Sequence, residues 1–288
     1  MTVSQDVLVQ FDPNNVMVGI AGYYVAPEGT QHVIVGFRDG TLTEVYWKSG
    51  QGVHQDTLAR FSNGVVGVGA YYDTKEGSQH AVIGTIDGQL IELYWKSGQG
   101  VHQDVLTSFS NGFSGLAAYY IPTEDTQHVI AGTTDGNLRE VYWKSGLGVH
   151  QDVLVSSVQI AGVGAYYDTK EGSQHAIYGT SDGTLNEAYW KSGQGVHQDV
   201  LTSFNSSFTF GGISAYYVPT EDTQHAIVGT NDNNLTEVYW KSGQGVHRDV
   251  LATFPNGIGA VGGYFVDGEN TQHAIVGSYD GRLIELYW

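Results

Sequence analysis

The chain has 288 residues, of which 41% are hydrophobic and 12% aromatic, so it can build a core and is not expected to be disordered. Its formal net charge of −18, from 30 acidic and 12 basic residues, argues against nucleic acid or anionic lipid as a partner, since both bind clustered Lys and Arg. No apolar stretch is long enough to cross a membrane, and the lack of cysteine excludes disulfides and cysteine-ligated zinc.

The N-terminal segment, residues 3–11, has the apolar and polar pattern of a β-strand. It contains no basic stretch followed by an apolar run, so no secretory signal is predicted here and the compartment is not assigned. The same pattern returns at residues 101–106, as the last of four runs in a repeated unit. Residues 3–11 are therefore a free-standing copy of a fourth strand.

The first complete unit contains four short runs rich in β-branched and aromatic residues, at 16–24, 31–36, 42–47 and 53–61. Between the second and third runs stands Asp39-Gly40, a dipeptide typical of a tight hairpin turn. The third run ends in Tyr-Trp and is followed by a glycine-containing loop, Lys-Ser-Gly-Gln-Gly. Each unit is therefore expected to form a four-stranded antiparallel meander.

The unit recurs at intervals of about 48 residues, and all six Trp residues occupy the same position in it. Four strands per unit and this period predict one all-β domain, residues 1–288, folded as a six-bladed β-propeller. The sixth unit stops after its third strand, so residues 1–11 are expected to close blade 6 as its fourth strand. The predicted blades span about 12–61, 62–109, 110–157, 158–204, 205–254 and 255–288.

A three-residue hairpin loop would pair residue 32 with 46 and 34 with 44, placing His32 and Glu44 on one blade face and Trp47 on the other. The His-Glu face of one blade and the Trp face of the next should then border one cleft. The candidate ligand-binding residues are these positions in every unit: His32, Glu44, Trp47, His80, Glu92, Trp95, His128, Glu140, Trp143, His175, Glu187, Trp190, His225, Glu237, Trp240, His273, Glu285 and Trp288.

The succession of an apolar strand, an Asp-Gly turn, Leu-x-Glu, an aromatic pair and Ser-Gly-x-Gly resembles the repeat of the fungal and bacterial fucose-binding six-bladed propeller lectins. The resemblance covers the whole chain and implies a sugar held between adjacent blades by an Arg, a Glu and a stacked aromatic residue. Glu44 matches the Glu position. The Arg position falls on His32 and the aromatic position on Val53, and Trp47 could supply the stacking surface instead.

The same residues could instead have structural roles. His and Glu could form a hydrogen-bond network between strands, and Tyr-Trp could be core between blades, as could the paired Tyr23-Tyr24 and its copies. In the repeated Val-His-Gln-Asp, Ser4 replaces the His of the N-terminal copy while Asp6 stays. This predicts a structural role for the Asp, and an exposed or site position for His54 and its copies.

Metal binding by the 11 histidines is not expected, because no helix brings them to one face and copies in different blades lie far apart. No cofactor is expected either. Catalysis is disfavoured, because no unit carries a unique set of polar residues and no second acid is visible beside the repeated Glu.

The sequence thus predicts a non-enzymatic, multivalent lectin that binds glycans or glycoconjugates, as a monomer or small homo-oligomer. The alternative is a protein-interaction scaffold, or an idealised repeat propeller with no ligand of its own, because the near identity of the copies fits recent duplication or design equally well.

Overall fold

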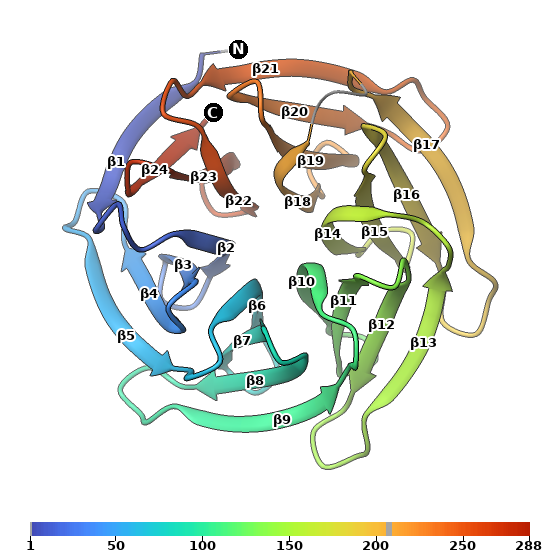
Figure 1. The fold of residues 1–288 in the computed structure, drawn as a ribbon, viewed down its shortest axis with the longest axis horizontal. Helices are drawn as coiled ribbons and strands as arrows, with labels where there is room; N and C mark the ends of the chain where they lie inside the picture. The colour runs from blue at the N-terminus through green and yellow to red at the C-terminus, as the bar shows by residue number, and fades with distance from the viewer. Residues whose placement is uncertain (1, 206–208) are drawn as a thin grey trace.

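The computed structural model describes residues 2–205 and 209–288, and it arranges six four-stranded antiparallel sheets around a central axis (Figure 1). Blade 1 contains β2 (Met17–Val25), β3 (Thr30–Phe37), β4 (Thr41–Trp47) and β5 (His54–Arg60). Blade 2 contains β6 (Val65–Asp73), β7 (Ser78–Thr85), β8 (Gln89–Trp95) and β9 (His102–Ser108). Blade 3 contains β10 (Phe113–Ile121), β11 (Thr126–Thr133), β12 (Leu138–Trp143) and β13 (His150–Val155).

The other three blades repeat this order from the axis outwards. Blade 4 contains β14 (Ile160–Asp168), β15 (Ser173–Thr180), β16 (Thr184–Trp190) and β17 (His197–Ser203). Blade 5 contains β18 (Phe210–Val218), β19 (Thr223–Thr230), β20 (Asn234–Trp240) and β21 (His247–Thr253). Blade 6 contains β22 (Ile258–Val266), β23 (Thr271–Ser278), β24 (Arg282–Tyr287) and, as its outer strand, β1 (Ser4–Gln10). No helix occurs in residues 2–205 and 209–288, hence none there that could cross a membrane.

The ring is closed by the N-terminal strand, as the sequence predicts. β1 pairs antiparallel with β24, with Ser4 opposite Tyr287 and Asp6 opposite Glu285. Its partly buried Leu8 and Val9, with Phe11 just beyond it, pack against the hydrophobic cluster between blades 6 and 1. The two ends of the chain are thereby joined in one sheet (Figure 1).

The innermost strands are rich in Gly and Ala because six of them converge on the axis. A Cβ atom on Gly69 would come within 2.6 Å of the backbone nitrogen of Ala118 in the next blade. Side chains that point between blades, such as Val33, Ile34 and Leu42, are instead fully buried and form the core. The small residues therefore allow the blades to approach closely enough for these side chains to pack.

Two glycines with positive φ, Gly88 in the tight β7–β8 turn and Gly98 in the longer β8–β9 loop, test how much a steric clash adds to backbone strain. Gly88 and Gly98 both have positive φ, 84° and 74°, but a Cβ on Gly88 would lie 2.1 Å from the Phe109 carbonyl oxygen, whereas Gly98 has open space around it. We expect Gly98→Ala to lower the free energy of unfolding by about 1 kcal/mol from backbone strain alone, and Gly88→Ala by about 3 kcal/mol or more because the clash adds to that strain. Urea denaturation of both variants measures the difference, and equal losses would contradict it.

Candidate functional site

The predicted register of the second and third strands is correct. Between β3 and β4, His32 lies opposite Tyr46 and Ile34 opposite Glu44. His and Glu consequently share one face in each blade, and the His Nδ1 atom lies 2.7–2.9 Å from a Glu Oε1 atom in all six copies. These pairs are His32–Glu44, His80–Glu92, His128–Glu140, His175–Glu187, His225–Glu237 and His273–Glu285.

The histidine of each pair has hydrogen-bond partners on both ring nitrogens. In blade 3, Nδ1 of His128 lies 2.8 Å from Glu140, and Nε2 lies 2.8 Å from the hydroxyl of Thr126. His128 and Glu140 are only 3% and 5% exposed. His and Glu therefore form a hydrogen-bond network between strands, which was one of the two interpretations of the sequence. In Glu140 the bond to His128 uses Oε1 and leaves Oε2 for another donor.

A cleft of about 550 Å³ lies between blades 3 and 4, and we call it cleft 3/4. Blade 3 supplies His128, Glu140 and Tyr142, and blade 4 supplies Trp190. The loop 192–196 that follows Trp190 forms part of the same wall. The His-Glu face of one blade and the Trp of the next therefore border one cleft, as expected from the register.

The tryptophans belong mainly to the core between blades. Trp47, Trp95, Trp143, Trp190 and Trp240 are 5–7% exposed and lie within the hydrophobic clusters. The amide of Gln174 can be oriented so that its oxygen accepts a hydrogen bond from Trp190 Nε1 at 3.1 Å while its nitrogen donates to Glu140. The indole of Trp190 is therefore held by a hydrogen bond at the wall of cleft 3/4, and at 5% exposure only a small part of it can meet a ligand.

Four stacked aromatic side chains, Tyr–His–Tyr–His, cross each of blades 1 to 5, and this stack was not predicted from the sequence. In blade 3 it runs Tyr119–His128–Tyr142–His150, with ring centroids 5.2–5.7 Å apart. The outer histidine is exposed, as predicted for His54 and its copies. In blade 6 the stack stops at Tyr287, because Ser4 stands where the outer His would be. Aligning the four strands of a unit in register could have revealed this ladder.

A second acid lies beside the repeated Glu, which corrects the expectation that none is present. Asp152 in β13 is directly opposite Glu140 in β12 and lines cleft 3/4 with it. Asp152 is exposed, yet its carboxylate is hydrogen-bonded with the Tyr142 side chain, and the equivalent pairing occurs in blades 1, 2, 4 and 5, which is consistent with the structural role predicted for this aspartate position. Its carboxylate does affect Tyr142: burial first, and then the charges of Asp152 and Glu140, raise the pKa of that phenol.

Polar contacts connect the loops at cleft 3/4, which are the β10–β11 loop of blade 3 and the loop after β16 of blade 4. Ser192 Oγ donates to Glu124 Oε1 at 2.7 Å across the two blades. The neighbouring Asp125 pairs with Lys75 of blade 2 at 2.5 Å and with Lys144 of its own blade at 3.1 Å. Hydrogen bonding to Lys75 is the main reason that the pKa of Asp125 falls to about 2.

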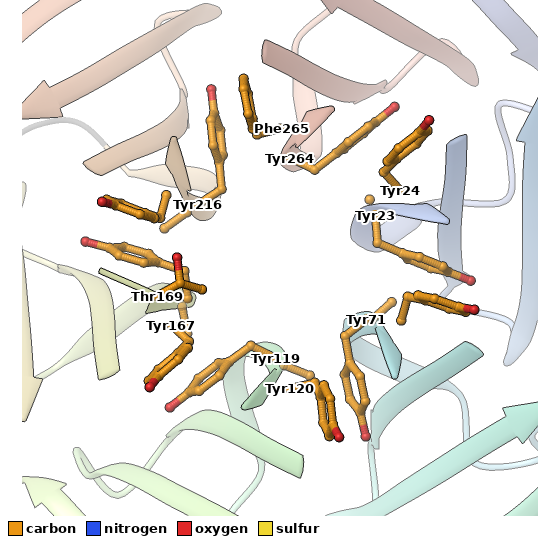
Figure 2. Close-up of a pocket in the computed structure, with 18 of the residues that line it drawn as sticks. Tyr23, Tyr24, Tyr71, Tyr119, Tyr120, Tyr167, Thr169, Tyr216, Tyr264 and Phe265 are labelled. Atoms are coloured by element: carbon orange, nitrogen blue, oxygen red, sulfur yellow. The ribbon is translucent and has the colours of Figure 1, made fainter. Parts of the chain in front are cut away.

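A second pocket, of about 380 Å³, opens on the central axis and is lined by the paired aromatic residues (Figure 2). The first tyrosine of each pair is buried, as predicted, and its hydroxyl points away from the axis; that of Tyr23 donates to Gln79 of the next blade at 2.8 Å. Tyr24, Tyr72 and Tyr167 are only half-buried, because they face this pocket.

Within residues 2–205 and 209–288, no group of three or more His, Asp or Glu side chains is arranged to hold a metal ion.

No protein-family model matches the sequence, and no curated protein is significantly similar to it. Among solved structures, AofleA from Arthrobotrys oligospora is similar with a TM-score of 0.73 at 14% identity, covering 100% of this chain and 86% of the other. The Aleuria aurantia lectin, solved in complex with α-methyl-L-fucoside, has a TM-score of 0.64 at 13% identity, with coverages of 96% and 95%. The NanB sialidase from Streptococcus pneumoniae has a TM-score of 0.72 at 8% identity, with coverages of 98% and 70%.

At such identities the likeness concerns the fold. The chain is a six-bladed β-propeller whose structural neighbours include fucose-binding propeller lectins, in agreement with the resemblance seen in its repeat.

Proposed function

We propose that this protein is a lectin that binds carbohydrate in equivalent clefts between adjacent blades, without catalysis. The observation that carries the proposal is cleft 3/4, where a bonded Glu, a Tyr and an Asp of one blade face a Trp and a glycine-rich loop of the next. The Aleuria aurantia lectin, one of the structural neighbours, supports the same conclusion.

The chemistry of cleft 3/4 suits a pyranose. The carboxylates of Glu140 and Asp152 are hydrogen-bond acceptors for neighbouring hydroxyl groups. The small exposed part of Trp190 and the apolar Val196 offer contacts for the C–H side of a sugar ring. Shallow sites of roughly millimolar strength on one rigid ring become effective when several engage the same glycan-bearing surface.

The absence of catalysis is argued from the placement of the acids. Glycosidases generally hold two carboxyl groups on either side of the scissile bond. In cleft 3/4 Glu140 and Asp152 are neighbours on one wall, and the described residues that blade 4 supplies to the cleft include no acid. We therefore expect no hydrolysis of a bound oligosaccharide, although one structural neighbour is a sialidase.

A glycan array followed by calorimetric titration tests the proposal. We expect binding with a stoichiometry near five, because the side chains of Glu44, Glu92, Glu140, Glu187 and Glu285 are 7% exposed whereas that of Glu237 is only 1% exposed. The same mixtures are then analysed for released sugar. No binding to any saccharide at about 10 mM, well above the expected dissociation constant, would overturn the lectin proposal, and released sugar would overturn the non-catalytic one.

A further inference from the structure

The inter-blade cleft is negatively charged, and no cation lines it. Glu124, Glu140 and Asp152 all border cleft 3/4, whereas the described residues that line it include neither Lys nor Arg. Lys144, in the loop after β12, is engaged elsewhere: it pairs with Asp125 and donates to the carbonyl oxygen of Glu124 at 3.3 Å. A ligand in this cleft therefore meets three carboxylates, and no described lining residue is a lysine or arginine that would balance them.

Two of these acids directly oppose one another, and the arrangement occurs in every blade. Like charges on directly opposite residues of an antiparallel pair destabilise a sheet. The opposed pairs are Glu44–Asp56, Glu92–Asp104, Glu140–Asp152, Glu187–Asp199, Glu237–Asp249 and Glu285–Asp6. A cationic group bound between the two carboxylates would offset their repulsion.

The inner acid also has an unused oxygen that faces the cleft. The side chain of Glu140 is 7% exposed, lines cleft 3/4 and accepts a hydrogen bond from His128 through Oε1. Its Oε2 atom accepts no hydrogen bond from the described residues. This oxygen is accessible from the cleft, and a charged N–H group is the strongest hydrogen-bond donor that it can meet there.

The size of the cleft also suits a saccharide. The volume of about 550 Å³ lies in the range that holds a small ligand, and so admits one or two sugar rings.

We propose that the inter-blade clefts select amino sugars, with the protonated amine of a pyranose seated between the repeated Glu and the Asp opposite it. This inference rests on the proposed lectin function and narrows it to a cationic class of saccharide. An acidic saccharide would meet three like charges in the same place and is expected to be excluded.

The test compares the β-1,4 tetramer of glucosamine with the tetramer of N-acetylglucosamine, which has the same rings but no charge, by calorimetry on the full chain. We expect the glucosamine tetramer to bind at least about tenfold more tightly at about pH 7, since charge-assisted hydrogen bonds are the stronger ones. That advantage should vanish at about pH 9, where the amines of the glucosamine tetramer are deprotonated because the neighbouring oxygen substituents make them weaker bases than a lysine amine.

The pH comparison depends mainly on the ligand. Besides the three acids, the titratable groups that line cleft 3/4 are His128 and Tyr142, and His150 stacks on the outer side of Tyr142. From blade 4 the described lining residues carry no charge, and the exposed Lys191 lies just outside them. Measuring the uncharged N-acetylated tetramer at both pH values separates any titration of these protein groups from that of the ligand amine.

A variant identifies the groups responsible. Replacing the outer aspartate by asparagine in all six blades (Asp6, Asp56, Asp104, Asp152, Asp199 and Asp249) should weaken glucosamine tetramer binding about tenfold more than binding of the N-acetylated tetramer, because the asparagine oxygen still accepts hydrogen bonds from hydroxyl groups but no longer pairs with a charged amine. Its melting temperature should not fall, because the substitutions remove like-charge repulsion. Tetralysine with an acetylated N-terminus and an amidated C-terminus, which has four amines like the glucosamine tetramer but no sugar rings, is the control for charge alone.

The outcomes separate the two proposals. Equal or tighter binding of the N-acetylated tetramer or of methyl fucoside would overturn the amino-sugar inference and leave the lectin function standing. Tetralysine binding as tightly as the glucosamine tetramer would also overturn it, because charge alone would then explain the affinity. If no saccharide binds, both proposals fail.

Discussion

Deletion of residues 1–11 is expected to abolish the single cooperative unfolding transition of the closed propeller. β1 supplies the fourth strand of blade 6, and its removal exposes the backbone N–H and C=O groups of β24. Leu8, Val9 and Phe11 would leave the cluster between blades 6 and 1. At about 1–2 kcal/mol for each partly buried apolar side chain, together with the lost strand pairing, the loss of about 5 kcal/mol or more is comparable with the stability of a typical domain.

Circular dichroism melts and size-exclusion chromatography measure this effect. The shortened chain should melt at a much lower temperature and self-associate, because an unpaired strand edge is a template for another chain. A synthetic peptide of residues 1–11 added in trans should restore part of the stability. The matched control is Val7→Thr, a β-branched replacement at a β1 position that is 53% exposed, and it should melt like the parent. Unchanged melting of the shortened chain would refute the closure.

Replacing the repeated Glu by Gln in all six blades should reduce saccharide affinity about a hundredfold while the propeller stays folded. The substituted positions are Glu44, Glu92, Glu140, Glu187, Glu237 and Glu285. An amide oxygen can still accept the hydrogen bond from the neighbouring His, so the network between strands persists. The cleft loses the charged acceptor, and hydrogen bonds to charged groups contribute about 1.5–3 kcal/mol each.

The corresponding replacement by Leu is the structural control. It leaves six buried histidines without their carboxylate partner, and each unsatisfied group costs about 1–3 kcal/mol, so this variant is expected not to fold. Titration calorimetry at a temperature where the Gln variant is folded separates binding from stability. Undiminished binding by the Gln variant would place the sugar elsewhere, and the tyrosine-lined central pocket would be the next site to test.

Much of the fold could be predicted from the sequence because its determinants are local and repeated. Asp39-Gly40 and its copies specify a tight hairpin from two residues, and that turn places His32 opposite Tyr46 and Ile34 opposite Glu44. The spare strand at residues 3–11 predicts how the ring closes. Together these features predicted that the His-Glu pair of one blade and the Trp of the next would border one cleft, as they do in cleft 3/4.

The features that the sequence did not predict depend on how strands joined by longer loops pair with each other. Between β12 and β13 the register shifts after Leu138, and this bulge helps to set which residues of the outer strand face the cleft. The loop that connects these two strands is longer than a tight hairpin, so its sequence does not reveal the register. Asp152 therefore emerged as the partner of Glu140 only in the structure.

The sequence by itself determined the number of blades, the order of their strands, the closing segment and the face that carries His and Glu, because turn chemistry and the two-residue period of a strand act over a few residues. Only the tertiary structure decided how far each side chain reaches the cleft, since that depends on how two blades pack. It buried the indole of Trp190, exposed the carboxylate of Asp152 and buried the side chain of Glu237, whereas the side chains of its five copies stay 7% exposed. Burial of this kind is set by neighbours in an adjacent blade, about 48 residues away in the chain.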